Sequence, residues 1–243
     1  MKIENDNISF QSKIKFIDSK TFKDKIKGLN PKRHEVGWPW TADAMKLGKN
    51  LYTTGIMDCI AVIIKDGNKI KLGHIATYTQ GEAKQAHQKG FSINNFERRL
   101  LEKINLDNEN LHGFILGGFQ LKPTDKNNAK QLAQIKQIFE KNIIPYSIFG
   151  ARKEVRHFGK FSLFFSNKED TLYISNTLAN KKSKIRRKPE IEVKDNTVEY
   201  NTYTKTRNVN GVKYKCTRKE SDTEGFFKSQ FRQVSICKID TLV

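Results

Sequence analysis

Residues 58–78 read DCIAVIIKDGNKIKLGHIATY, which is two apolar runs separated by a turn sequence. The first run, Asp58 to Ile64, has the length of a strand and is apolar without alternation, as in a strand buried on both faces. Asp66-Gly67-Asn68 has the composition of a turn, and Ile70 to Tyr78 is typical of a second strand. The sequence therefore predicts a β-hairpin whose first strand is buried.

Signals for helices and strands alternate after this hairpin. A helix that Ser92 or Asn94 can cap runs to Ile104 and presents one apolar face. A second helix, capped by Asp125 or Asn127, also carries an apolar stripe. Further strands are expected at residues 111–121, 143–149, 158–165 and 172–174. This order of elements predicts a layered domain of mixed α and β structure.

The composition divides the chain into three zones. Residues 1–49 are polar and are expected to form an N-terminal extension that packs on the core. Residues 50–178 contain the dense alternation of helix and strand signals. Residues 179–243 begin with a basic linker sequence, KKSKIRRKP, and continue with alternating strands around Asn210-Gly211, a tight hairpin signal. They are expected to form a small β-rich C-terminal region.

The chain is strongly basic, since 45 Lys and Arg stand against 26 Asp and Glu and give a net charge of +19. Its 37% of hydrophobic residues is enough to exclude a disordered chain, and no apolar run is long enough to span a membrane. The N-terminus lacks the apolar segment of a signal peptide, so we expect a cytoplasmic location in the producing cell. Residues 1–180 carry 29 cationic against 18 anionic side chains, and residues 181–243 carry 16 against 8. Because this charge is spread out, nucleic acid is allowed as a partner but is not favoured.

Cys59 is the best candidate for a nucleophile, because it opens the buried strand of the hairpin. A thiol nucleophile needs a base or a cation nearby, and His74 lies fifteen residues on in the second strand, where cross-strand pairing can bring it alongside. A third group should orient the imidazole, and Thr53 or Thr54 is available upstream. The competing interpretation makes Cys59 a small buried hydrophobic residue and His74 a surface residue of its strand.

The other cysteines and histidines do not predict a cofactor. The three cysteines cannot all pair and show no CxxC spacing, and the five histidines show no spacing typical of metal ligands. We therefore expect no disulfide framework, no metal and no cofactor.

The residues around Cys59 form a longer pattern, TTGIMDCIAV at residues 53–62, followed by a turn and then GH at residues 73–74. This pattern resembles the signature of CheD-type glutamine deamidases, in which a Thr and a Gly precede the Cys at the same spacing and a catalytic His closes the next strand. Residues 114–119, FILGGF, are similar to the family's lysine-phenylalanine-glycine-glycine-alanine strand. The resemblance covers about residues 50–176. Met57 and Asp58 stand where the family usually has small residues.

The resemblance implies an α+β fold of layered mixed β-sheets, β-sandwich-like and flanked by helices, to which the C-terminal region adds a small β-rich extension. It implies that Cys59 is the nucleophile, that His74 is the general base and acid, and that Thr53 orients His74. The residues that it implies for the oxyanion hole and the pocket are Asp58, Gly55, Gly117 and Gly118.

The implied reaction is the hydrolysis of a glutamine side-chain amide on a target protein through a thioester at the cysteine. An amine in place of water would give a transglutaminase side activity. The same Cys–His fold underlies the cytotoxic necrotizing factor and lethal-factor toxins, which deamidate glutamines on host proteins. The implied partner is thus a protein with an exposed glutamine, and the implied setting is a secreted effector or toxin that is injected into a host cell. We expect a monomer.

A different class of function is compatible with the composition alone. The chain would then be a basic, non-catalytic binding module for RNA, the ribosome or an acidic protein partner, with Cys59 incidental. Such a module predicts steeply salt-dependent binding that survives replacement of Cys59. The aromatic residues do not interleave with basic ones as they do in RNA-recognition strands, which weighs against this hypothesis.

Overall fold

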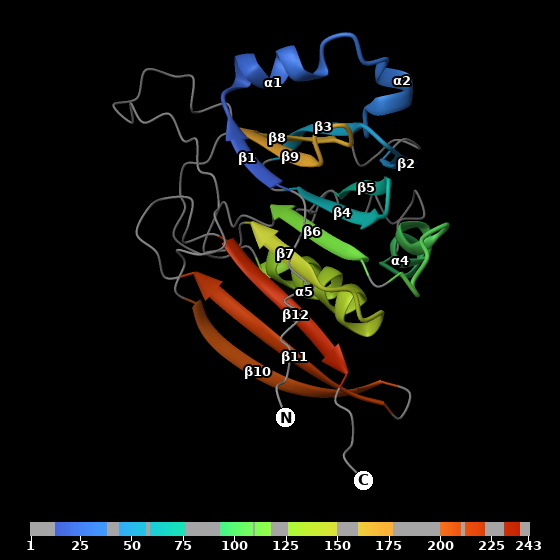
Figure 1. Ribbon diagram of the computed structural model, residues 1–243, viewed down its shortest axis with the longest axis vertical. Coiled ribbons are helices and arrows are strands. Elements are labelled where there is room, and N and C mark those ends of the chain that lie inside the picture. The colour runs from blue at the N-terminus through green and yellow to red at the C-terminus, as the bar shows by residue number, and fades with distance from the viewer. Residues whose placement is uncertain are drawn as a thin grey trace.

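The chain folds as an α+β protein with two β-sheets stacked between helices (Figure 1). The computed structural model describes residues 13–37, 44–56, 59–75, 93–108, 110–117, 126–149, 160–176, 200–209, 212–221 and 231–238. In Figure 1 the helices α1 and α2 cover one sheet, and α4 and α5 lie against the other. The layered, helix-flanked fold class predicted from the sequence is confirmed.

The small sheet has four strands in the order β1-β9-β8-β3. Strand β1 pairs in parallel with β9, and the other neighbours are antiparallel. Strands β1, β9 and β3 therefore run in one direction and end at the same end of the sheet. Their bounds are β1 Lys13–Ile17, β3 Leu51–Ile56, β8 Phe161–Ser166 and β9 Thr171–Asn176.

The large sheet has eight strands in the order β10-β11-β12-β7-β6-β4-β5-β2. Only β6 and β7 pair in parallel, and α5 (Lys126–Lys141) forms the crossover between them. The C-terminal strands continue this sheet, because β12 pairs with β7. The bounds are β2 Met45–Gly48, β4 Ile60–Asp66, β5 Lys69–Ile75, β6 His112–Gly117, β7 Tyr146–Phe149, β10 Tyr200–Val209, β11 Val212–Ser221 and β12 Phe231–Lys238.

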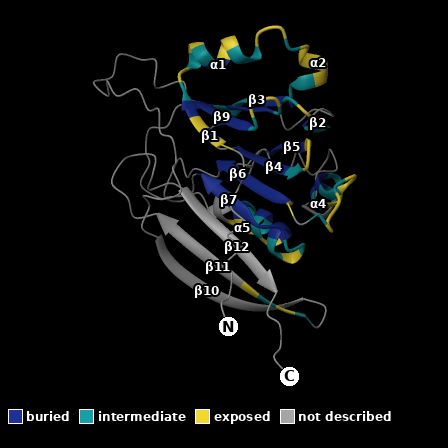
Figure 2. Ribbon diagram, in the orientation of Figure 1, coloured by how far each residue is buried: buried dark blue, intermediate teal, exposed yellow. Residues whose placement is uncertain are grey.

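Strand β4 is buried on both faces, which explains its apolar sequence without alternation (Figure 2). Ala61 and Ile63 face the core between the two sheets. Val62 and Ile64 face the opposite way, into a second core that holds apolar residues of α4 (Ile93–Leu101) and α5. The turn at residues 66–68 joins β4 to β5 in register, so the hairpin predicted from the sequence is confirmed.

Helix α1 (Ser19–Ile26) covers the outer face of the small sheet. Asp18 caps its N-terminus, because one carboxylate oxygen accepts hydrogen bonds of 2.8 Å from the backbone N–H groups of Lys20 and Thr21. The apolar residues that pack α1 on the sheet are Phe22, Tyr52, Phe164 and Tyr173. The short helix α2 (Pro31–His34) follows. None of the helices in the described ranges is long and apolar enough to cross a bilayer.

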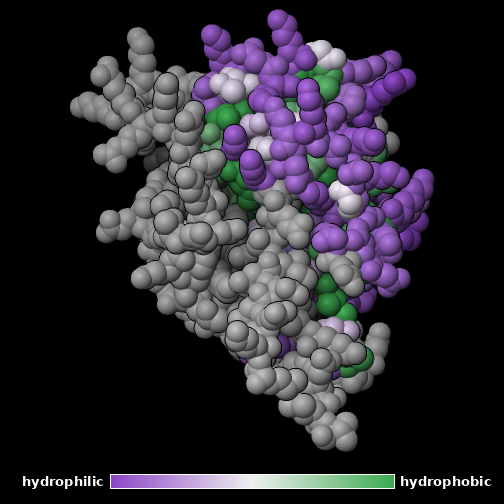
Figure 3. All heavy atoms as spheres, viewed as in Figure 1, coloured by the Kyte–Doolittle hydropathy of each residue, from purple (hydrophilic) through white to green (hydrophobic). Residues whose placement is uncertain are grey.

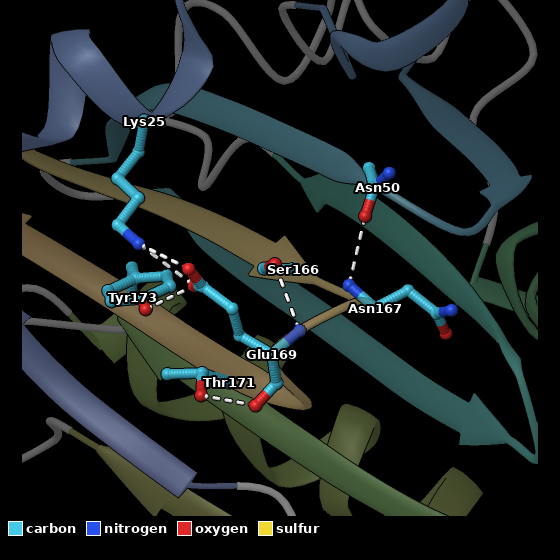
Figure 4. A network of polar contacts seen from close by, with 7 residues as sticks. All are labelled: Lys25, Asn50, Ser166, Asn167, Glu169, Thr171 and Tyr173. Carbon is cyan, nitrogen blue, oxygen red and sulfur yellow. Dashed lines mark hydrogen bonds and ion pairs between the residues drawn. The ribbon is translucent and has the colours of Figure 1, made fainter.

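A polar network also fixes α1 to the turn between β8 and β9 (Figure 4). Lys25 Nζ lies 2.7 Å from a carboxylate oxygen of Glu169 and 4.5 Å from the centre of the Tyr173 ring. The Tyr173 hydroxyl donates a hydrogen bond to the same carboxylate. Nearby, Asn167 N–H donates to the side-chain oxygen of Asn50 at 2.9 Å, which ties the start of β3 to the same turn.

Both terminal zones contribute strands to the sheets, beyond what the sequence predicted. Strands β1, β2 and β3 were not expected, since they are short and pair with partners distant in the sequence. The sequence also indicates a short helix at residues 21–29, and the structure has it as α1, at Ser19–Ile26. The expected extensions of β5 to Tyr78 and of β6 to Leu121 lie outside the described residues. The division of the chain at residues 49/50 and 178/179 stays a prediction.

The contact between β6 and α5 gives a test of this packing. A Cβ atom added at Gly113 would lie 2.0 Å from Cε1 of the fully buried Phe139 ring. We expect Gly113→Ala to lower the free energy of unfolding by about 1–3 kcal/mol, because the ring has no space to move into. Urea denaturation measures the loss.

The double variant Gly113→Ala/Phe139→Leu supplies the control for this prediction. Its loss should be smaller than the sum of the two single losses, since the shorter side chain makes room for the added methyl group. Strictly additive losses would mean that Gly113 and Phe139 are not packed as described.

Candidate active site

Cys59 and His74 belong to one face of the large sheet, Cys59 directly before β4 and His74 in β5, at the end towards which β6 and β7 run. Ala61 of β4 pairs directly with His74 of β5, and Cys59 is two residues before Ala61. Both Cys59 and Ala61 belong to the core between the sheets. In an antiparallel pair such diagonal neighbours have Cβ atoms at most about 7–8 Å apart, which is within reach of an imidazole ring.

Thr53 reaches the same imidazole from the opposite sheet. Its Oγ1 lies 2.8 Å from His74 Nδ1 in a hydrogen bond that joins β3 to β5. Thr53 is fully buried and His74 is 2% exposed, so water does not compete for this bond. Thr54, the alternative in the sequence, is half-buried. With Nδ1 held by Thr53, the second ring nitrogen Nε2 is directed away from β3.

A bulge in β3 lies between Thr53 and the point where the chain leaves the small sheet for Cys59. Pairing of β3 with β8 is interrupted between Thr53 and Ile56, and Gly55 between them has a φ of 77°. Glycine adopts this left-handed conformation without the strain that a side chain would introduce. Ile56 is the last residue of β3 in the small sheet. Cys59, three residues later, directly precedes β4, an interior strand of the large sheet. Gly55 is thus a backbone hinge of the site.

Gly117 lets β6 approach the backbone of Cys59 closely. Its φ is 113°, and a Cβ atom placed there would lie 2.3 Å from the Cys59 carbonyl oxygen. Gly117 pairs with Ile60, the residue that follows the cysteine. The glycine therefore lies beside the backbone of the candidate nucleophile, and its part in an oxyanion hole or pocket stays a prediction. Asp58 and Gly118, which were also predicted for this site, lie outside the described residues.

Burial keeps the His74 imidazole neutral. It lowers the pKa of His74 from 6.5 to about 4, because the charged form would lose its hydration in the core. A neutral ring with one nitrogen hydrogen-bonded to a hydroxyl group can hold its proton on Nδ1 and accept another on Nε2. At neutral pH the geometry thus suits a general base.

A second buried histidine lies farther along the same inter-sheet layer and was not predicted from the sequence. His112 Nε2 lies 3.5 Å from Ser147 Oγ, and His112 pairs across the strands with Lys65. Lys65 Nζ lies 2.7 Å from Asp170. Burial, with a smaller contribution from the Lys65 charge, lowers the pKa of His112 to about 3. His112 and Ser147 are 35 positions apart in the sequence, and no motif there would have revealed the pair.

Among the residues that the structure describes, no three His, Cys, Asp or Glu side chains are grouped in a way that could hold a metal ion. A scan against protein-family models matches none of them to this chain, and a search of the curated proteins also finds no match. The resemblance to the CheD-type deamidases therefore rests on the residues of the motif alone.

The two buried histidines predict a pH dependence of stability. Their pKa values in the folded protein lie below 6.5, so the unfolded chain takes up protons first as the pH falls. The free energy of unfolding is therefore expected to fall as the pH drops from about 6.5 towards 5, by up to about 1.4 kcal/mol per pH unit for each histidine. Urea titrations across this range measure the slope.

The single variants His74→Gln and His112→Gln are the controls for this pH effect. Each variant should remove about half of the slope, because each deletes one of the two imidazoles that bind a proton in the unfolded chain but not in the folded protein. A slope that neither variant changes would contradict the neutral, buried state of both rings.

Proposed function

We propose that this protein is a cysteine-dependent deamidase that hydrolyses the side-chain amide of a glutamine on a target protein. The observation that carries the proposal is the buried 2.8 Å hydrogen bond between Thr53 and His74, with Cys59 as the diagonal neighbour of His74 on the same face. A nucleophile, a base and a group that orients the base are the three parts that thiol catalysis requires.

In the first half of the proposed reaction, His74 Nε2 takes the proton of the Cys59 thiol, while Nδ1–H donates its hydrogen bond to Thr53 Oγ1. The thiolate attacks the carboxamide carbon of the glutamine, and the carbonyl oxygen takes up negative charge. Backbone N–H groups near Cys59 are the proposed donors to this oxyanion. The imidazolium of His74 then gives its proton to the nitrogen, the C–N bond breaks, and ammonia leaves a thioester behind.

In the second half, water replaces ammonia beside the thioester. His74 removes a proton from the water as the oxygen attacks the carbonyl carbon, and the C–S bond breaks to restore the Cys59 thiol. The side chain is released as glutamate, so one amide and one water become one carboxylate and one ammonium ion. An amine at the same position would form an isopeptide bond, which is the proposed transglutaminase side activity.

Gly117 is proposed to position the backbone of Cys59. Any side chain at residue 117 would collide with the Cys59 carbonyl oxygen. Glycine at this position therefore allows β6 to pack closely against the backbone of Cys59. The neutral imidazole fits the first step as well, since a ring that was already protonated could not accept the thiol proton. Thr53, Gly55 and Gly117 thus act on the positions of His74 and Cys59 and do not react themselves.

The proposed substrate is a protein that presents an exposed glutamine. The proposed place of action is a reducing cytoplasm, either that of the producing cell or that of a host cell into which the protein is injected as an effector or toxin. The support is chemical, since the mechanism needs Cys59 as a thiol, and reducing compartments keep thiols from forming disulfides.

Ammonia release from β-casein, a glutamine-rich and loosely folded protein, tests the proposal. The wild-type protein should release ammonia and raise the mass of casein peptides by the difference between an amide and a carboxylic acid. Cys59→Ser should abolish both signals, and Thr53→Val should reduce kcat by roughly 10- to 100-fold, because the imidazole loses the group that orients it.

Cys216→Ser is the matched control, because it removes a thiol of β11 and leaves the candidate site intact. It should keep full activity. Equal activity in Cys59→Ser and the wild type would overturn the proposed function, as would a casein that gains no acid groups at any enzyme concentration.

A further inference from the structure

The outer side of the small sheet carries a layer of exposed cations. Within residues 13–37 the exposed acidic side chains are only Asp18 and Asp24. The exposed basic side chains of the same range are Lys13, Lys15, Lys20, Lys23, Lys27, Lys32 and Arg33. Figure 3 shows hydrophilic residues gathered over α1 and α2 at the top of the view. The described N-terminal segment is therefore a basic surface as well as a structural cover.

Three of these lysines form one line along α1. Lys20 and Lys23 lie on α1 and Lys27 directly follows its last residue; all three are exposed, whereas Phe22 of the same helix is buried. Seven residues of helix span roughly 10 Å, which sets the length of this lysine stripe. It is a linear array of positive charges directed at the solvent.

The fold does not use the charges of this stripe. Lys25 of the same helix turns towards the sheet and binds Glu169, and Lys46 donates a hydrogen bond of 2.7 Å to the carbonyl oxygen of Lys32. Within the described residues, the ammonium groups of Lys20, Lys23 and Lys27 form no ion pair and no hydrogen bond. Like charges one turn apart repel each other, and the exposed Asp24 of the same helix offsets only part of the three positive charges.

The stripe begins at the end of the molecule that holds the candidate site. Strands β1 and β3 run in the same direction in the small sheet, and β3 leads directly towards Cys59. Helix α1 follows β1 after a single residue, Asp18. A chain that lies along the stripe from Lys27 to Lys20 thus points towards the end of the sandwich where Cys59 lies.

We propose that the lysine stripe Lys20–Lys23–Lys27 is a docking surface for an acidic segment of the substrate protein. This inference rests on the proposed function, and it adds that the target glutamine belongs to a protein with a run of Asp or Glu near it. Exposed carboxylates spaced along an extended or helical segment would pair with the three ammonium groups.

The same surface is less suited to nucleic acid. It contains seven exposed cations, of which six are lysines, whereas arginine is the residue that binds phosphates through two parallel hydrogen bonds. The aromatic side chains of this layer are buried under α1, so bases would find no described ring to stack on. Asp24 projects among the lysines and would repel a phosphate backbone, but a protein partner can bind it with a cation.

Fluorescence anisotropy with a labelled oligoglutamate peptide tests the docking surface. The full chain carries Cys59→Ser, so that binding is measured without catalysis. The triple variant Lys20→Gln/Lys23→Gln/Lys27→Gln should weaken binding by roughly tenfold, which is what three exposed ion pairs supply. The matched triple variant Lys69→Gln/Lys130→Gln/Lys168→Gln removes the same charge from exposed lysines elsewhere and should weaken binding less than about twofold.

Three other outcomes would change the assignment of the stripe or of the function. Equal losses in the two triple variants, or an oligoglutamate peptide that does not bind, would overturn the docking surface. If a duplex RNA of equal charge instead binds more tightly than the oligoglutamate peptide, and its binding is weakened only in the Lys20/Lys23/Lys27 variant, that result would assign the stripe to nucleic acid. Binding that behaves as predicted while the wild type releases no ammonia from β-casein would leave the docking surface in place and remove the proposed deamidase function.

Discussion

The hydrogen bond between Thr53 and His74 joins the two sheets at the point on which the proposed chemistry depends. Thr53 belongs to the small sheet and His74 to the large sheet, and neither side chain is open to water. The bond therefore fixes the ring and holds the sheets in one relative position. The bulge at Gly55 precedes the passage of the chain to Cys59, and the close approach at Gly117 sets β6 against the Cys59 backbone. A displacement of either sheet would separate the base from its orienting group or from the thiol.

Burial gives this arrangement both its order and its chemical character. The inter-sheet core that orders Cys59 also lowers the pKa of His74 to about 4, which leaves a neutral base at physiological pH. The same core lowers the pKa of His112, where the neighbours are a serine and a lysine. Burial thus keeps both histidines of this layer neutral, and they differ in the side chains next to each ring, a threonine at His74 and a serine and a lysine at His112.

The sequence predicted the parts of the structure that depend on local patterns. The continuous apolar run at residues 58–64 and the turn at 66–68 were enough to predict the β4–β5 hairpin, and its register then placed His74 beside Cys59. The choice between Thr53 and Thr54 needed the pairing of β3 with β8, because alternation along β3 turns Leu51 and Thr53 to the inter-sheet core and Tyr52 to the outer face. Strands β1 and β2 exist only through partners far along the chain, and so does the His112–Ser147 pair. No periodicity in a short polar segment reveals such partners.

The most direct test of the central claim is the protonation state of His74, read from the ¹⁵N resonances of its imidazole by NMR. The geometry predicts a neutral ring at pH 7 with the proton on Nδ1, a ring that stays neutral until the pH approaches 4, and an altered Nδ1 resonance in Thr53→Val. A ring protonated on Nε2, or an imidazolium already present at pH 6, would contradict the account.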